Sequence, residues 1–266
     1  MERRPVKERL FAKVNRSGPT QNHMDTPLAG YRSDFRPRSI RRTTMSGYVI
    51  VIPNKYPDVI QPLLESLKKY EPDTHVIIVA DGHDNGYGHE LIQYPFNTFR
   101  YARAVNLGIV RAMNIGHQPN IVLLNDDCVL LGEHTFHTMQ NQMELVQPVG
   151  LISPLIKGGV GNPGQRWHEK AKWWRQFETM KMAWGIDPVC FPCVMLKRDM
   201  VEHIGLLSEN IPGYGRDDND YCIRARLKGW WTAISGLSTV QHGDGTSSLE
   251  TGRGKSWSTS FARQLP

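Results

Sequence analysis

Residues 121–127 read IVLLNDD, four apolar residues followed at once by an asparagine and two aspartates. A short continuous apolar run that stops at turn-forming residues is typical of a strand buried on both faces of a parallel sheet. Two earlier stretches have the same form: residues 75–82 read HVIIVADG, and residues 48–54 read YVIVIPN. We therefore predict three buried strands, each ending in polar side chains.

The segments between these strands have the spacing of helices. Residues 58–70 repeat apolar side chains at helical intervals, with Asp58 placed to cap the N-terminus and Pro62 in the tolerant first turn. Residues 98–113 form a second such segment. Alternating strands and helices indicate βαβ crossovers, hence an α/β fold with a mostly parallel sheet flanked by helices. Farther along, the same criteria predict strands at 189–196 and 230–234 and helices at 198–204 and 218–228.

The composition fits one or at most two globular domains. The chain has 266 residues, of which 39% are hydrophobic and 22% charged. Its apolar runs are far shorter than the ~18 residues of a membrane span. The N-terminus lacks the apolar core of a secretory signal, and four cysteines agree with a reducing compartment. We expect a cytoplasmic protein.

The positive charge is concentrated at the N-terminus. Residues 1–45 carry 11 basic and 4 acidic side chains, a net charge of +7, whereas the rest of the chain carries a net charge of −1. We expect a basic, flexible tail over 1–45, a folded domain over 46–245 and a flexible Ser/Thr/Gly-rich end over 246–266. The tail is either a solvated extension or a handle for an anionic partner: a nucleic acid, an anionic lipid surface or an acidic protein.

Polar side chains end all three predicted strands: Asn54, Asp81, and Asp126 with Asp127. The carboxyl ends of parallel strands share one edge of a sheet, where ligands of open α/β sheets bind. Adjacent aspartates there can hold a hard divalent cation. For Asp126–Asp127, and likewise for Asp81–Gly82, a solvated turn is the alternative interpretation. Convergence of three strands on one edge favours a ligand site.

A second acidic group opens the predicted helix at 218–228. Asp217, Asp218 and Asp220 lie within four residues. Acids in a first helical turn stabilise the helix by capping and by the macrodipole. Three exceed what capping requires, so a carboxylate here is a candidate general base.

Two further groups carry weaker signals. Cys190 and Cys193 have the spacing of zinc ligands, but the other two cysteines lie in separate elements, so buried thiols are the preferred interpretation. Aromatic faces suit apolar faces of sugars, so Trp173, Trp174 and Trp184 form either a sugar-stacking wall or part of a core.

Six motifs in chain order resemble the family-2, inverting glycosyltransferases of GT-A fold. They are YVIVIP at 48–53, VADG at 79–82, RYARAVNLG at 100–108, LNDD at 124–127, DDNDYCIR at 217–224, and His242. No single motif is specific, but six in family order and spacing are. Two departures matter: Ala80 stands where the family usually has an acid, and residues 125–127 are not a literal Asp-x-Asp.

The resemblance implies a GT-A, Rossmann-like fold with a smaller acceptor-side subregion. It implies transfer of a sugar from a nucleoside-diphosphate sugar, such as a UDP- or dTDP-sugar, to an acceptor hydroxyl, with inversion and assistance from Mn²⁺ or Mg²⁺. The acceptor stays open among a glycan, a lipid-linked sugar, a protein and a modified nucleobase. The implied roles are donor binding for Pro53, Asn54, Asp81, Arg100 and Asp126, metal binding for Asp127 and His242, and general base for Asp218 or Asp217, with Asp218 favoured.

Two rival functions stay in view. A nucleotidyltransferase acting on sugar phosphates would show a Gly-rich, basic loop after the first strand, but residues 53–57 read PNKYP. A nucleic-acid-binding protein led by the basic tail leaves the acidic edge unexplained, because carboxylates repel phosphates. For a glycosyltransferase, Arg253 and Lys255 in the C-terminal end would order over the diphosphate as a lid.

Overall fold

The structure is a computed structural model that describes residues 47–83, 88–95, 98–116, 119–160, 162–166, 182–184, 188–211 and 216–243. The expected basic tail, the expected lid, Trp173 and Trp174 lie outside these residues, and of Trp184 only the backbone is described. None of the helices in the described part is long and apolar enough to cross a membrane.

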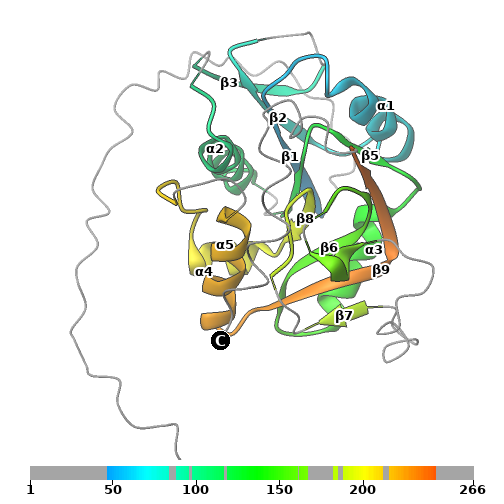
Figure 1. Cartoon of the computed structure of the whole chain (residues 1–266), viewed down its shortest axis with the longest axis vertical. Helices are drawn as coiled ribbons and strands as arrows, with labels where there is room; N and C mark the ends of the chain where they lie inside the picture. The colour runs from blue at the N-terminus through cyan, green and yellow to red at the C-terminus, as the bar shows by residue number, and fades with distance from the viewer. Residues whose placement is uncertain are drawn as a thin grey trace, which may run out of the picture. The chain divides into compact units, whose positions relative to one another are not determined.

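Strands and helices alternate through the first half, as predicted, except for one additional strand between the second strand and the second helix (Figure 1). The elements of this half are β1 (Tyr48–Asn54), α1 (Gln61–Tyr70), β2 (Val76–Asp81), β3 (Glu90–Tyr94), α2 (Tyr101–Met113) and β4 (Asn120–Leu124). Those of the second half are β5 (Cys128–Leu130), α3 (Thr135–Leu145), β6 (Val149–Gly158), the short 3-10 helix η1 (Pro163–Gln165), β7 (Met182–Trp184), β8 (Cys193–Leu196), α4 (Arg198–Ile204), α5 (Asp217–Leu227) and β9 (Trp231–His242).

The described strands form one sheet in the order β3-β2-β1-β4-β8-β6-β9-β5, with β7 on β9. The first four run parallel, which confirms the predicted parallel core. β8 runs antiparallel to both β4 and β6, and β9 runs parallel to β6. β5 and β7 are antiparallel to β9. The carboxyl ends of β1, β2, β4, β6 and β9 therefore share one edge with the amino ends of β5 and β8. We call this edge the rim.

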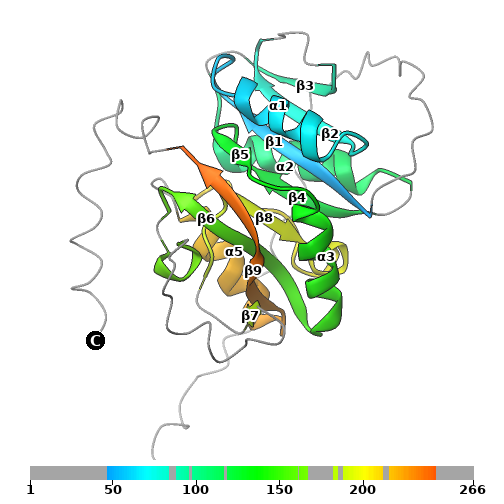
Figure 2. The ribbon, with the colours of Figure 1, turned by 90° about the vertical axis from the view of Figure 1, so that its right-hand side faces the viewer.

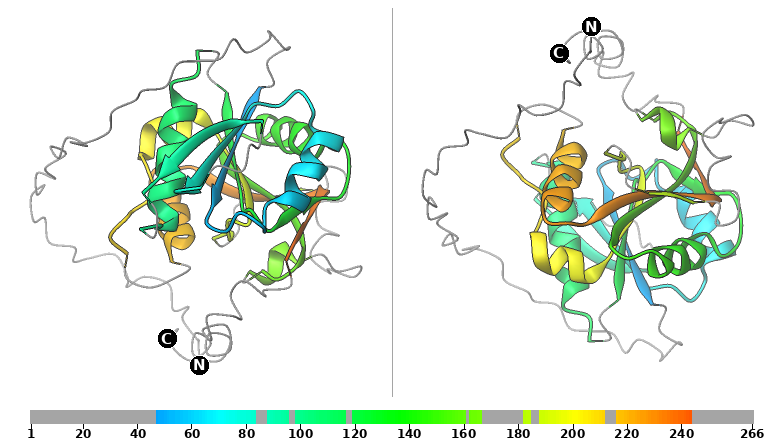
Figure 3. Two further views of the ribbon diagram at one scale, coloured as in Figure 1. Left: turned by 90° about the horizontal axis from the view of Figure 1, so that it is seen from above. Right: turned by 90° about the horizontal axis from the view of Figure 1, so that it is seen from below.

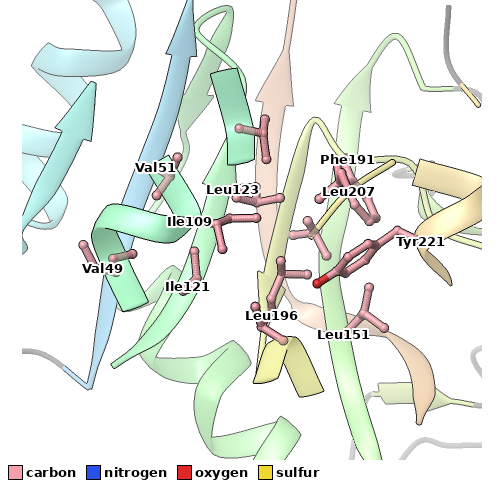
Figure 4. Close-up of a cluster of buried hydrophobic side chains, with 14 of the residues drawn as sticks. Val49, Val51, Ile109, Ile121, Leu123, Leu151, Phe191, Leu196, Leu207 and Tyr221 are labelled. Atoms are coloured by element: carbon pink, nitrogen blue, oxygen red, sulfur yellow. The ribbon is translucent and has the colours of Figure 1, made fainter. Parts of the chain in front are cut away.

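Helices cover both faces of the sheet. α2, α4 and α5 pack on one face, and α1 and α3 on the other (Figures 1 and 3). Val49 and Val51 belong to the first core, and Ile50 and Ile52 to the second. Figure 4 shows the first core, where side chains from β1, α2, β4, β8 and α5 meet. Burial on both faces explains why the β1 sequence is apolar without alternation.

The predicted start of the first helix is wrong. α1 begins at Gln61, after Ile60, and not after Asp58. Asp58 lies in a preceding turn in which the Val59 N–H donates to the Tyr56 carbonyl over 3.2 Å. Asp58 therefore lies two residues before Ile60, which holds the N-cap position, and no side chain in the described part of the chain caps α1.

Candidate active site

The rim collects the side chains predicted from strand ends. Asn54 ends β1 directly after Pro53, Asp81 ends β2, and His242 ends β9. Asp126 and Asp127 lie between β4 and β5. Figure 2 shows β6 and β9 side by side and pointing the same way, which brings the end of β9 to the rim.

Asp126 is tied to the end of β1. The Asn54 Nδ2 donates to Asp126 Oδ2 over 2.9 Å, and the Lys55 backbone N–H donates to the same oxygen over 3.3 Å. Burial raises the pKa of Asp126 to about 6; the charge of Asp127 adds to this effect, while the two hydrogen bonds oppose it. Asp126 is thus a fixed acceptor that is costly to ionise without a compensating cation or donor.

Asp127, directly before β5, and His242, at the end of the neighbouring β9, form a pair. His242 Nε2 lies 3.2 Å from Asp127 Oδ1, and His242 Nδ1 bonds to the Gly159 carbonyl. A carbonyl only accepts, so Nδ1 carries a proton and Nε2 faces the carboxylate. Burial opposes protonation of His242, but the Asp127 carboxylate and the Gly159 carbonyl outweigh it, and the pKa of the imidazole is raised.

This pair fits a divalent cation. Carboxylate oxygen and imidazole nitrogen are both ligands of first-row divalent metals, and a carbonyl on Nδ1 is a common way to orient a ligating histidine. Among the described residues no group of three or more His, Cys, Asp or Glu side chains is arranged around a metal position. Asp127 and His242 would therefore hold a cation that completes its shell with ligand phosphate and water, as Mg²⁺ commonly does.

Asp81 ends β2 at the rim, and Arg100 directly precedes α2. Asp81 is 5% exposed, and its Oδ1 has no hydrogen-bond partner in the described part of the chain. A buried carboxylate oxygen without a donor is unfavourable, so a ligand donor such as a base N–H would be well placed there. Arg100 is exposed and directly precedes α2. The Tyr101 hydroxyl donates to Asn125 Oδ1 over 3.1 Å, which ties the start of α2 to the end of β4.

The acids that open α5 have different environments. Asp220 pairs with Arg224 over 2.8 Å one turn along the helix. Asp218 accepts from the Asn219 N–H over 2.7 Å, and burial raises the pKa of Asp218 to about 6. Burial also raises the pKa of Asp217. Asp220 is therefore a structural charge, whereas burial makes Asp217 and Asp218 stronger bases than exposed aspartates.

Residues 188–192 connect the two acidic groups. The segment follows the rim because Leu124 on β4 pairs with Cys193 on β8, and the Asn125 N–H donates to the Pro192 carbonyl over 2.8 Å. On the other side, the Cys190 thiol hydrogen-bonds Asp218. The predicted site residues thus form two groups, the rim and the start of α5, with this segment between them.

Sequence reasoning missed the residues that support this arrangement. Lys55, Tyr101 and Gly159 act through a backbone N–H, a hydroxyl and a carbonyl, and only Tyr101 lies inside one of the motifs. The cysteines are free thiols; three are buried, as preferred, and Cys190 is half-buried.

The sequence matches a known protein family. Residues 48–205 match the family described as Glycosyl transferase family 2. No curated protein sequence matches the chain.

Solved structures with a similar fold include three transferases. GalNAc-T7 with UDP, GalNAc and Mn²⁺ aligns with 73% of this chain at a TM-score of 0.53 and 11% identity. TarS of S. aureus covers 73% at a TM-score of 0.53 and 13% identity. The mannosyltransferase PcManGT from Pyrobaculum calidifontis, in complex with GDP-Man and Mn²⁺, covers 73% at a TM-score of 0.51 and 15% identity. The match spans only 43%, 36% and 56% of those three chains, respectively. At such identities the likeness shows the GT-A fold.

Proposed function

The chain belongs to glycosyl transferase family 2, and from this we propose that it transfers a sugar from a nucleoside-diphosphate sugar to an acceptor hydroxyl with inversion at the anomeric carbon. The observation that carries the proposal is the rim itself: Asn54, Asp81, Asp126, Asp127 and His242 meet at the ligand-binding edge of the sheet. The family match favours glycosyl transfer over the nucleotidyltransferase alternative.

The donor would lie along the rim. Asp81 has a buried oxygen available for a donor group of the base, and Arg100 is exposed at the start of α2. Asp126, held by Asn54, would accept from a ribose or sugar hydroxyl. Solved neighbours that hold UDP or GDP-Man support a nucleotide-sugar donor. A UDP- or dTDP-sugar is our proposed donor.

Asp127 and His242 would hold Mn²⁺ or Mg²⁺ at the diphosphate. When bound, the cation would act as a Lewis acid on the departing nucleoside diphosphate. The Gly159 carbonyl fixes the proton on Nδ1 of His242 and so keeps Nε2 directed at Asp127. Two solved neighbours contain Mn²⁺, which supports this assignment.

Asp218 would act as the general base. Its carboxylate takes the proton of the acceptor hydroxyl while the oxygen attacks the anomeric carbon on the face opposite the diphosphate. The bond from that carbon to the diphosphate oxygen breaks, and the nucleoside diphosphate leaves. A pKa of about 6 suits this role, because the carboxylate is ionised at neutral pH yet is a stronger base than an exposed aspartate.

Donor hydrolysis tests the proposal without a known acceptor. The chain is incubated with a panel of UDP-, dTDP- and GDP-sugars and Mn²⁺, and nucleoside diphosphate release is measured. We expect slow release from one donor class, dependence on Mn²⁺, and thermal stabilisation by the matching nucleotide with Mn²⁺. Asp73→Asn, in an exposed turn, is the matched control and should behave as wild type. Stabilisation by DNA or RNA, with no donor consumed, would instead support the nucleic-acid-binding alternative.

A further inference from the structure

Gln165 is a fully buried side chain that bonds to the backbone of a single residue. Its Nε2 donates to the Cys190 carbonyl over 2.9 Å, and its Oε1 accepts from the Cys190 N–H over 2.7 Å. Nε2 also donates to the Ser153 hydroxyl oxygen over 2.8 Å, and Ser153 is itself fully buried on β6. An amide that pairs with both backbone groups of one residue makes the two hydrogen bonds that a neighbouring strand would make. It therefore fixes the position and the direction of that peptide.

A second side chain of the same short segment also bonds to residues 188–190. Asn162 Nδ2 donates to the Pro188 carbonyl over 2.6 Å, and Asn162 Oδ1 accepts from the Gly164 N–H over 2.8 Å. Residues 162–165 therefore hold residues 188–190 through two amide side chains. Because β6 carries Ser153, this support is anchored in the sheet.

The opposite side of the supported segment faces α5. The Cys222 thiol, one turn farther along α5 than Asp218, donates weakly to the Val189 carbonyl over 3.7 Å. The Cys190 thiol acts as a hydrogen-bond donor that lowers the pKa of Asp218 against the effect of burial. The titratable groups around Asp218 are therefore Asp217 on its own helix, Cys190 on the segment and Cys222 on the next turn. A shift of the Cys190 peptide would change the contact made to Asp218.

We infer that Gln165 is a positioning residue for Asp218: its amide fixes the Cys190 peptide, and the fixed peptide holds the Cys190 thiol against the Asp218 carboxylate. The role of Asp218 as general base rests on the proposed function, but the positioning does not. An amide suits this contact, because one end donates and the other accepts. A glutamate at position 165 would still accept from the Cys190 N–H but could not donate to the Cys190 carbonyl or to Ser153.

A double-mutant cycle on thiol chemistry tests this geometry without any sugar substrate. The full chain is treated with iodoacetamide near neutral pH, and Cys190 alkylation is followed by peptide mass spectrometry, which separates it from the three buried thiols. The thiolate is the reactive form, and a carboxylate in contact disfavours it. Asp218→Asn should therefore accelerate Cys190 alkylation severalfold in the otherwise native chain. In a Gln165→Ala background the same change should have almost no further effect.

The matched control is Gln142→Ala, a buried glutamine on α3, which carries no site residue. It should preserve the full acceleration by Asp218→Asn. If circular dichroism shows that Gln165→Ala does not fold, Gln165→Glu replaces it and should reduce the acceleration. Equal acceleration in the wild-type and Gln165-variant backgrounds, or no acceleration by Asp218→Asn at all, would overturn the inference.

Turnover gives a second, separate result. Gln165→Glu should lower kcat for donor hydrolysis and leave the donor KM nearly unchanged, since the displaced group is the base and not the nucleotide site. If no nucleotide sugar is consumed by wild type, the proposed function fails while the alkylation cycle still decides the positioning role. If sugars are consumed but the cycle shows no coupling, only the positioning role is lost.

Discussion

Asp217 and Asp218 are adjacent on the first turn of α5, and the Cys190 thiol is a hydrogen-bond donor to Asp218. We therefore expect Asp218→Asn to lower turnover by ~10²- to 10⁴-fold, the usual cost of losing a general base. Donor affinity should stay almost unchanged, because this side chain would meet the acceptor. Wild-type turnover should fall as pH drops below about 6, where Asp218 becomes protonated.

Asp217→Asn provides the matched comparison at the same helix end. It should cost less, because its carboxylate would orient a hydroxyl or cap the helix. Steady-state kinetics with calorimetric donor binding distinguishes the cases. Greater damage from Asp217→Asn at intact donor binding would exchange the two roles, and full activity of both variants would rule out the proposed base mechanism.

Asp127 should be essential for cation-dependent nucleotide binding. It is the strand-end acid that contacts His242, the other candidate ligand. Asp127→Ala should abolish the Mn²⁺-dependent part of UDP or dTDP binding in calorimetry, while circular dichroism shows that the fold is retained. Asp73→Asn is the control. Unchanged affinity for both nucleotides, with and without Mn²⁺, would remove Asp127 from the site.

Asp126 should destabilise the ligand-free chain at neutral pH. Its pKa rises from 3.8 to about 6 on folding, so between these values the folded state binds more protons than the unfolded state. The free energy of unfolding must then decrease as pH rises through this window, by about 3 kcal/mol for a shift of this size. Asp126→Asn should raise stability at pH 7 and flatten the dependence. Urea unfolding at several pH values measures this effect, and an unchanged slope in the variant would contradict it.

At the scale of elements, the approach of α2 to β1 depends on one glycine. A Cβ at Gly108 would lie 2.2 Å from Val51 Cγ1, whereas one at Gly116 would meet nothing within 4 Å. Gly108→Ala gains about 1 kcal/mol of helix propensity. Overpacking typically costs about 1–3 kcal/mol, and here the added methyl group would clash with β1, which is fully buried. We expect net destabilisation and weaker donor binding, because α2 carries Arg100 and Tyr101 to the rim. Thermal unfolding with Gly116→Ala as control tests this; equal stability of both variants would contradict it.

The strands that could be predicted from sequence are those whose residues are uniformly buried. β1, β2 and β4 were located to within one residue, because burial on both faces leaves an uninterrupted apolar run. β3 was missed because it lies at the edge and mixes buried and exposed residues. β6 was missed because Gly150 and Pro154 interrupt its pattern. β9 was predicted only in its first part, since its continuation SGLSTVQH is polar and is held by pairing with β5 and β6.

The site residues also differ in whether they could be predicted from sequence. Asn54, Asp81 and the Asp126–Asp127 pair could be predicted because a strand end fixes where they point. Gln165 could not, because its bonds to Cys190 join residues 25 positions apart and leave no local periodic signal. Contacts of that kind depend on the antiparallel return of β8 beside β4, which is a property of the assembled sheet.

At the scale of the whole molecule, the excess of basic residues and the proposed site residues lie in different parts of the sequence. Residues 1–45 carry +7 and the remainder −1, so the acidic site belongs to a nearly neutral part of the sequence. Electrostatic attraction between exposed charges is screened over about 10 Å at 0.1 M salt. A basic segment can therefore bring the protein to an anionic surface without altering the pKa values of groups more than about 10 Å from it.

Deletion of residues 1–44 tests this separation. If the segment acts only by charge, donor hydrolysis should remain near wild type, because every proposed site residue lies beyond position 52. Binding to vesicles with anionic lipid should weaken, and the difference from wild type should shrink as salt is raised, because screening removes the contribution of the tail. Sedimentation with vesicles at low and high salt measures it, with neutral vesicles as control. Loss of folding in the deletion variant would show that the segment is structural, and vesicle binding that salt does not weaken would show that the surface is recognised by contacts other than charge.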